Sequence, residues 1–105
     1  CVAKLKKNRV YFLKKFVPNL LRAVVVIPNK PISTNQSRTT LKENYPLNDV
    51  VTNISSSSII TAAFFSEKYE LLRSIVEDKI HQEERMKGIP ELFKVREIAL
   101  REGAL

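Results

Sequence analysis

The sequence predicts an α+β fold in which three N-terminal strands are followed by helices. In residues 1–28, apolar residues alternate with basic ones or follow one another as β-branched residues, and both patterns are typical of strands. From residue 46 onwards, apolar residues recur three and four positions apart, which is the spacing of an amphipathic helix. Strands gathered at one end of a chain and helices at the other indicate an α+β protein.

Two of the predicted strands form a hairpin. Val2–Lys6 alternates apolar and basic residues, and Val10–Phe16 begins with β-branched and aromatic residues. Asn8 and Arg9 lie between the two runs, where a short turn connects paired strands. We therefore expect the chain to begin with two antiparallel strands.

The third predicted strand is Arg22–Ile27. Its unbroken Ala-Val-Val-Val-Ile run suits a strand that is buried on both faces, and Pro28 ends it because proline has no backbone N–H to donate. Beyond this strand, the hydroxyl group of Ser33 or Thr34 can cap a short helix, which we expect to run to about Leu41.

A long helix is predicted to start near Pro46, because proline suits the first turn of a helix. Apolar and small residues then fall near one stripe: Leu47, Val50, Val51, Ile54, Ser58, Thr61, Ala62 and Phe65. The four consecutive serines Ser55–Ser58 are typical either of a linker or of a helix that packs closely against a neighbour. Because apolar residues flank the serines on both sides, we favour the helix.

Two further helices are predicted towards the C-terminus. The first is marked by the helical spacing of Tyr69, Leu71, Leu72, Ile75, Val76 and Ile80. Gly88 and Pro90 interrupt this pattern. The last helix contains Leu92, Phe93, Val95, Ile98, Ala99 and Leu100. It is expected to end at Gly103, because glycine readily adopts the left-handed conformation that closes a helix.

The composition argues against several classes of protein. The single cysteine, Cys1, cannot form an internal disulfide, and no Cys/His cluster indicates zinc, so we predict no metal site and a reducing, cytoplasmic environment. The longest apolar run, Ala23–Ile27, is too short to cross a bilayer, so no membrane association is expected. A start at cysteine rather than methionine suggests that a preceding segment is absent.

Positive charge is concentrated in the first part of the chain. Residues 1–42 contain ten Lys and Arg and no acidic residue, whereas residues 43–105 contain eight basic and eleven acidic residues. A basic stretch suits nucleic acid phosphates or an acidic membrane surface, and it equally suits a solvated face or a surface that contacts an acidic domain. The side chains that would form a nucleic-acid-binding face are Lys4, Lys6, Lys7, Arg9, Lys14 and Lys15.

One group of titratable residues lies near the end of the helix predicted to precede Gly88. Glu77 and Asp78 each lie about one helical turn from His81. This combination suits acid–base chemistry or cation binding, and it equally suits the intrahelical ion pairs of a solvated helix end.

Two arginines are the main candidates for a binding site. A guanidinium group stays charged and matches a carboxylate with two parallel hydrogen bonds. Arg38 follows the hydroxyl residues Ser33, Thr34 and Ser37, which can bind the same anion, and Arg85 lies where the predicted helix ends. With only two glycines, the chain has no glycine-rich loop for nucleotide phosphates, so a nucleotide site must lie elsewhere.

Three separated blocks of the sequence resemble the homoserine kinase family of the GHMP kinase superfamily. They are "VVVIPNKPISTNQSR", "YPLNDVVTNISSSSIITAAF" and the stretch from "YELLRSIVEDKIHQEERMKGIP" to the end, and their order and spacing match over essentially the whole chain. The resemblance implies an ATP-dependent phosphotransferase that converts the hydroxyl of L-homoserine to O-phospho-L-homoserine in threonine biosynthesis. ATP and Mg²⁺ would be the cofactors of the full-length enzyme.

The resemblance also implies a domain organisation. Residues 1–105 would be a partial GHMP kinase of two domains, with residues 1–28 as strands from the end of the N-terminal domain and the junction. Residues 29–105 would be a segment of the ferredoxin-like C-terminal domain, truncated before the last glycine-rich motif. We therefore expect no cofactor binding and no ATP turnover by these 105 residues alone. The expected partners are L-homoserine and the rest of the kinase chain, and relatives are commonly homodimers.

The resemblance assigns substrate-binding roles to four residues. The segment like "STNQSR" contributes to amino-acid binding in the family, so Thr34 and Arg38 inherit that role. The segment like "HQEERMKGIP" supplies Arg85 to the same pocket, and we expect Asn53 to line it. Arg38 and Arg85 are expected to converge on the substrate carboxylate. The resemblance assigns no catalytic residue and no metal ligand within this chain.

Two alternatives remain open from the sequence. Another GHMP kinase that acts on a different small alcohol would share the fold but would not need a pair of arginines for a carboxylate. A basic nucleic-acid-binding module would instead place its lysines and arginines on one exposed face.

Overall fold

The structure is a computed structural model of the chain, and it describes residues 1–29, 39 and 41–105. A hairpin comes first and helices follow, so the α+β class is confirmed. The short helix expected from Ser33 or Thr34 to about Leu41 falls mainly outside the described residues.

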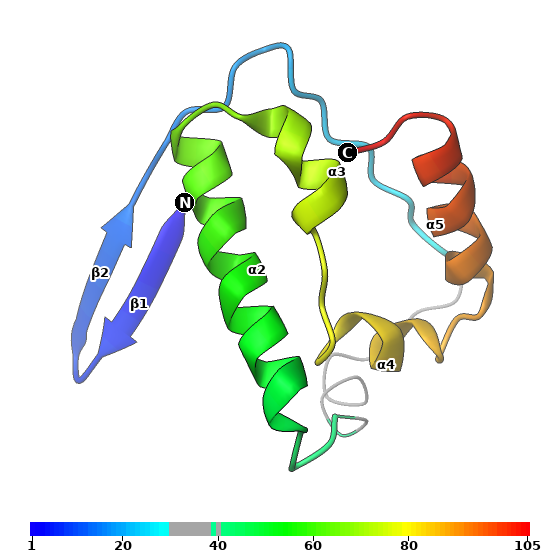
Figure 1. The fold of residues 1–105 in the computed structure, drawn as a ribbon, viewed down its shortest axis with the longest axis horizontal. Coiled ribbons are helices and arrows are strands. Elements are labelled where there is room, and N and C mark those ends of the chain that lie inside the picture. Colours follow the sequence, from blue (N-terminus) through cyan, green and yellow to red (C-terminus); the bar gives the residue numbers. More distant parts are fainter. Residues whose placement is uncertain (30–38, 40) are drawn as a thin grey trace.

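The helices follow one another along the second half of the chain. The long helix α2 (Leu47–Phe65) leads into a 3₁₀ turn, η1 (Tyr69–Leu71), and then into the short helices α3 (Leu72–Ile75) and α4 (Gln82–Met86). Helix α5 (Glu91–Arg101) lies near the C-terminus. In Figure 1 the hairpin lies on one side of α2, and α3, α4 and α5 lie on its other side. Among the helices of the described residues, none combines the length and the apolar character that a membrane span requires.

The predicted hairpin is confirmed, with a shift of one residue. Strand β1 (Val2–Lys6) pairs antiparallel with β2 (Arg9–Leu13), and the register places Lys6 opposite Arg9. The turn is therefore Lys7 and Asn8, and the second strand begins one residue earlier and ends three residues earlier than predicted. Lys7 has φ of 52°, the left-handed backbone that such a tight turn requires.

Helix α2 contains all four consecutive serines, so the helical interpretation of that stretch is confirmed. Several hydroxyl groups are satisfied within the helix itself: Ser58 Oγ donates to the Ile54 carbonyl at 2.8 Å, and Thr61 Oγ1 donates to the Ser57 carbonyl at 2.8 Å. Ser56 is buried. Two of the four serines, Ser55 and Ser58, thus donate their hydroxyl groups to carbonyls of the helix itself and need no outside partner.

The single helix predicted from Tyr69 to Ile80 is wrong. The chain forms η1 and α3 and then leaves the helical conformation at Val76, which has φ of −77° and ψ of 96°. A turn follows before α4 begins. The helical spacing of apolar residues continues through this break, but Asp78 accepts backbone hydrogen bonds from the residues after it, and this favours a turn over a helix.

The last helix, α5, ends as predicted. Arg101 is its final residue, and Gly103 has φ of 98°. Beyond it, Ala104 N donates to the Ala99 carbonyl at 2.9 Å, and Gly103 N donates to the Leu100 carbonyl at 3.3 Å. This pair of bonds is the Schellman motif, in which glycine at the left-handed position closes a helix without strain.

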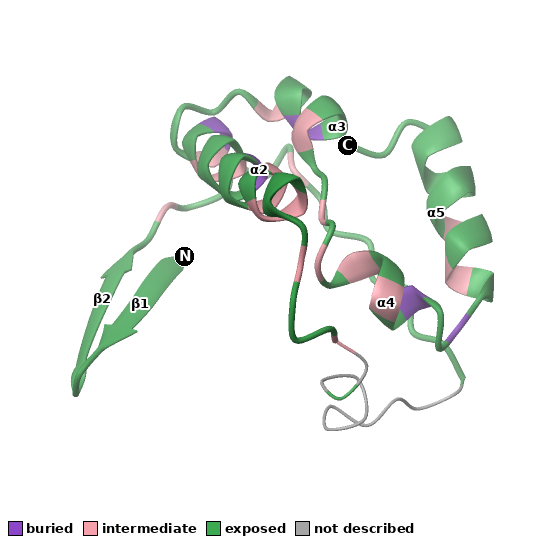
Figure 2. Ribbon diagram, turned by 60° about the horizontal axis from the view of Figure 1, so that its bottom comes forward, coloured by how far each residue is buried: buried purple, intermediate pink, exposed green. Residues whose placement is uncertain are grey.

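Little of the apolar surface is buried. Among residues 1–29, 39 and 41–105, those that are buried are Ser56, Ala63, Leu72, Met86 and Ile89. Figure 2 shows them on α2, on α3 and around the end of α4, whereas both strands of the hairpin are exposed throughout. The accessible surface is 9194 Å², whereas a compact 12.0 kDa protein exposes about 6,000 Å². Many large apolar side chains of the described residues are therefore exposed to solvent.

The third predicted strand is not formed among the described residues. Arg22–Ile27 has no strand assignment and no strand beside it. Val24 is 89% exposed and Ile27 is 82% exposed, so the run is not buried on both faces as expected. A strand needs a neighbour to pair its backbone N–H and C=O groups, and the described part of the chain supplies none next to this run.

Candidate functional site

Two of the four residues predicted to bind substrate lie in the described part of the chain. Asn53 is half-buried on α2, and Arg85 is exposed on α4. Thr34 and Arg38 lie outside the described residues. The convergence of Arg38 and Arg85 on one carboxylate therefore stays a prediction.

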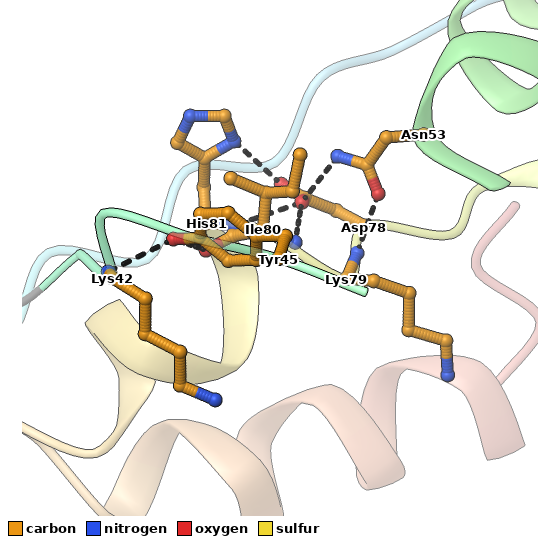
Figure 3. Close-up of polar contacts among 7 residues, drawn as sticks. All are labelled: Lys42, Tyr45, Asn53, Asp78, Lys79, Ile80 and His81. Atoms are coloured by element: carbon orange, nitrogen blue, oxygen red, sulfur yellow. Dashed lines mark hydrogen bonds and ion pairs between the residues drawn. The ribbon is translucent and has the colours of Figure 1, made fainter. Parts of the chain in front are cut away.

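Asn53 connects α2 to the turn that precedes α4 (Figure 3). Its Nδ2 donates to Asp78 Oδ1 at 2.9 Å, and its Oδ1 accepts from the backbone N–H of Lys79 at 2.7 Å. Both ends of the amide group are thus engaged by the same turn. Because α2 is a helix of 19 residues, this pair of bonds ties a short connecting segment to the longest element of the fold.

Asp78 gathers several donors on one carboxylate oxygen. In addition to Asn53, its Oδ1 accepts the backbone N–H groups of Ile80 and His81, each at 2.8 Å. Its other oxygen, Oδ2, lies 3.5 Å from His81 Nδ1. An aspartate that accepts from the backbone two and three residues later fixes a turn in the manner of a helix cap.

The environment of Asp78 favours its charged form. Partial burial alone would raise the pKa of this carboxyl group. Hydrogen bonds from the Asn53 side chain and from the backbone of His81 and Ile80, together with the His81 ring, outweigh that effect, so the pKa of Asp78 lies below its ordinary value. The carboxylate is therefore ionised at neutral pH and fully available as an acceptor.

A tyrosine adds a second connection to the same turn. Tyr45 Oη accepts the backbone N–H of Lys42 at 3.0 Å and lies 3.5 Å from the Ile80 carbonyl oxygen. The Lys42 ammonium group lies 3.8 Å from Glu84 Oε1, on α4. The segment that precedes α2 is thereby held against the turn and against α4.

The predicted group of Glu77, Asp78 and His81 does not converge on one point. Asp78 and His81 are paired, but Glu77 forms its ion pair with Lys79 instead, at 3.0 Å. These residues also lie in a turn rather than on a continuous helix. In the described ranges, no group of three or more His, Cys, Asp or Glu side chains is arranged to hold a metal ion.

Arg85 is the basic residue whose side chain is free at this site. Its backbone N–H donates to the His81 carbonyl at 3.1 Å, which is the first hydrogen bond of α4. Within residues 1–29, 39 and 41–105, no hydrogen bond or ion pair engages its guanidinium group. An exposed and unpaired guanidinium group can bind an anionic ligand without first losing an internal partner.

The basic residues of the hairpin do not all share one free face. The register places Lys4, Lys6 and Arg9 on the same face of the two strands. Lys15 has an intramolecular partner, because its ammonium group donates a hydrogen bond to the Phe65 carbonyl oxygen at 3.0 Å. The six-residue basic face required by the nucleic-acid-binding alternative is therefore incomplete.

The sequence interpretation missed the turn built by Asp78 and the role of Tyr45. A signal for the turn exists, because an aspartate commonly accepts the backbone N–H groups two and three residues after it, as Asp78 does from Ile80 and His81. The contact between Asn53 and Asp78 joins residues 25 positions apart and has no local signal.

The chain is similar to homoserine kinases of several organisms. Homoserine kinase of Nautilia profundicola is 77% identical over all 105 residues, that of Nitratiruptor sp. is 56% identical over 104 residues, and that of Wolinella succinogenes is 51% identical over 104 residues. In each case the aligned stretch is 99% or more of this chain and 36% of the relative. No protein-family model and no solved structure matches the chain.

These similarities confirm the resemblance to homoserine kinases that the three sequence blocks indicated. The chain is homologous, over its whole length, to a stretch of homoserine kinases, and it spans about a third of the length of the relatives it matches.

Proposed function

We propose that this chain is a segment of a homoserine kinase. The whole enzyme would transfer the terminal phosphate of ATP to the side-chain hydroxyl of L-homoserine and so form O-phospho-L-homoserine, in the cytoplasmic biosynthesis of threonine. The observation that carries the proposal is the 77% identity to homoserine kinase of Nautilia profundicola over all 105 residues. The aligned stretch includes every element described above and is not limited to one motif.

The role of this segment is to bind the carboxylate of the substrate. Arg38 and Arg85 would hold it from two sides, and Thr34 would donate a further hydrogen bond. The free guanidinium group of Arg85 supports this role. So does Lys42, which lies beside Glu84: the chain passes close to α4 only four residues after Arg38.

Asn53 would contribute to the wall of the pocket rather than to direct binding. Its side-chain oxygen and one of its amide hydrogens are already used by the turn at Asp78 and Lys79. This turn leads directly into α4, so Asn53 would support the helix that carries Arg85 without contacting the substrate.

The chemistry at the phosphate would depend on parts of the enzyme beyond these residues. Phosphoryl transfer requires that the acceptor hydroxyl be held in line with the γ-phosphate while positive groups and Mg²⁺ balance its charge. The arginines would supply the first requirement by fixing the far end of homoserine. The glycine-rich loops of a two-domain GHMP fold would supply the second, and the exposed run Arg22–Ile27 would pair there with a neighbouring strand.

The proposal is tested in the whole enzyme with Arg85→Ala. Loss of a charge-assisted contact should lower kcat/KM for homoserine. The decrease corresponds to a loss of roughly 2–4 kcal/mol of transition-state stabilisation, and most of it should be an increase in KM. Arg101→Ala is the matched control, because Arg101 is exposed on α5 and pairs only with its neighbour Glu102. The control should leave the kinetics unchanged.

A second substrate separates this enzyme from a related kinase. The compound 3-aminopropan-1-ol is homoserine without its carboxylate. The normal enzyme should strongly prefer homoserine, and Arg85→Ala should lose much of that preference. An enzyme that phosphorylates both compounds equally well would instead be a kinase for a different small alcohol, and one that phosphorylates neither would contradict the proposal as a whole.

A further inference from the structure

The path from α2 to Arg85 is a continuous series of short hydrogen bonds. Asn53 Nδ2 donates to Asp78 Oδ1 at 2.9 Å, and the same oxygen accepts the His81 N–H at 2.8 Å. The His81 carbonyl then accepts the Arg85 N–H at 3.1 Å. Three successive hydrogen bonds thus connect Asn53 on α2 to the backbone N–H of Arg85. The position of the Arg85 backbone therefore depends on the long helix.

Helix α4 depends on this support because it is short. It contains only five residues, and a helix of that length is not stable by itself. Its C-terminal end is held by the buried residues Met86 and Ile89. Its N-terminal end lacks a side-chain cap at His81, and the carboxylate of Asp78 supplies the acceptor for that turn.

We propose that Asp78 is a positioning residue for Arg85, and that Asn53 acts with it by fixing the carboxylate against α2. The inference rests on the proposed function, because it gives Asp78 a role only if Arg85 binds the substrate. Asp78 would not touch homoserine. It would hold the start of α4 so that the guanidinium group reaches the substrate carboxylate in the productive geometry, to which binding is sensitive within about 1 Å.

The test is a double-mutant cycle in the whole enzyme with Asp78→Ala, Arg85→Ala and the double variant. Asp78→Ala should raise KM for homoserine by about tenfold to a hundredfold, with a smaller change in kcat. In the Arg85→Ala background, the same change should have little further effect on kcat/KM, because the group that it positions is already absent. If Asp78 had only a structural role, the fold-changes in kcat/KM of the two single variants would multiply in the double variant.

Two companion variants sharpen the result. Asp78→Asn retains an oxygen that can accept from Asn53, Ile80 and His81, so it should recover most of the KM lost in Asp78→Ala. Glu77→Ala is the matched control: Glu77 lies in the same turn but pairs only with Lys79, and its removal should leave KM unchanged. If Asp78→Ala fails to fold, Asn53→Ala replaces it in the cycle with the same expectation.

The outcomes separate this inference from the proposed function. An unchanged KM in Arg85→Ala would remove the proposed substrate site, and this inference with it. A raised KM in Arg85→Ala, combined with a full and independent effect of Asp78→Ala in the double variant, would overturn only the positioning role. Asp78→Ala kinetics equal to those of the normal enzyme, or no recovery in Asp78→Asn, would overturn it as well.

Discussion

The Lys15 ammonium group donates a hydrogen bond to the carbonyl oxygen of Phe65 at 3.0 Å, although the two residues are 50 positions apart. Phe65 is the last residue of α2, where the unpaired carbonyl groups of the helix carry partial negative charge. The same ammonium group also lies 2.8 Å from Glu67 Oε1. This contact fastens the end of the hairpin to the end of the long helix.

Replacing Lys15 with alanine should therefore destabilise the folded protein. We expect Lys15→Ala to lower the free energy of unfolding of the whole protein by about 0.5–1 kcal/mol, the usual value for a partly exposed cation at a helix C-terminus. The measurement is denaturant unfolding at low and at high salt. Lys6→Ala, on the hairpin opposite Arg9, is the control and should have no measurable cost. Equal effects of the two variants would contradict the role of the Phe65 contact.

Two helices end with different residues in the left-handed conformation, and in both the next residue donates its N–H back to the carbonyl five positions earlier. Gly103 has φ of 98° at the end of α5, whereas Glu67 has φ of 59° at the end of α2, where Lys68 N donates to the Ala63 carbonyl at 2.9 Å. A residue with a Cβ atom is strained there by roughly 1–2 kcal/mol. Introducing glycine at residue 67 should therefore raise the stability of the fold, whereas removing glycine at residue 103 should lower it.

Glu67→Gly should stabilise the protein by up to about 1 kcal/mol, since relief of strain exceeds the loss of an exposed ion pair. Gly103→Ala should destabilise it by about 1 kcal/mol even though a new Cβ would meet no atom within 4 Å. Thermal melting of the two variants tests whether each changes the stability in the expected direction. A destabilised Glu67→Gly would show that the pair with Lys15 is worth more than the backbone strain.

The hydroxyl group of Tyr69 is buried without a hydrogen-bond partner among the described residues. Its ring packs edge-on against Phe64, with the ring centres 5.7 Å apart. Because Tyr69→Phe keeps the ring and removes the unsatisfied hydroxyl, we expect it to leave stability unchanged or to raise it by about 1 kcal/mol. Tyr45→Phe is the contrasting variant and should be destabilising, because it removes the acceptor of the Lys42 N–H. A destabilised Tyr69→Phe would reveal a partner for the hydroxyl in the folded protein.

The lowered pKa of Asp78 predicts how stability changes with pH. Because its folded pKa lies below its unfolded pKa of about 4, the charged carboxylate stabilises the fold fully above that value, and this stabilisation is lost as the pH falls through the folded pKa. The stability difference between the normal protein and Asp78→Asn should therefore be largest near neutral pH and shrink in acid. A difference that stays constant from about pH 7 to about pH 3 would contradict the shift.

Much of the fold could be predicted because its signals are local. The hairpin follows from alternation and a polar turn, and the end of α5 follows from Gly103. Helix α2 follows from apolar spacing that continues through the serines. These features depend on residues within a few positions of one another, so the sequence alone specifies them.

The features that could not be predicted depend on distant partners. Apolar spacing from Tyr69 to Ile80 indicated one helix, but the turn at Asp78 is stabilised by Asn53, which belongs to another element. The run Arg22–Ile27 has the composition of a strand, yet no described strand lies beside it. In the candidate site, the chemistry of arginine and the family resemblance singled out Arg85, whose substrate role stays a prediction. The hydrogen bonds around its backbone could be seen only in three dimensions.

The uncovered run Arg22–Ile27 has a consequence for handling this polypeptide. Four of its five consecutive uncharged residues have high β-propensity, and no strand of the described residues pairs with them. Such a segment is the kind that joins intermolecular β-structure. The polypeptide of these 105 residues should therefore aggregate through this segment, and Val25→Lys should keep it dispersed.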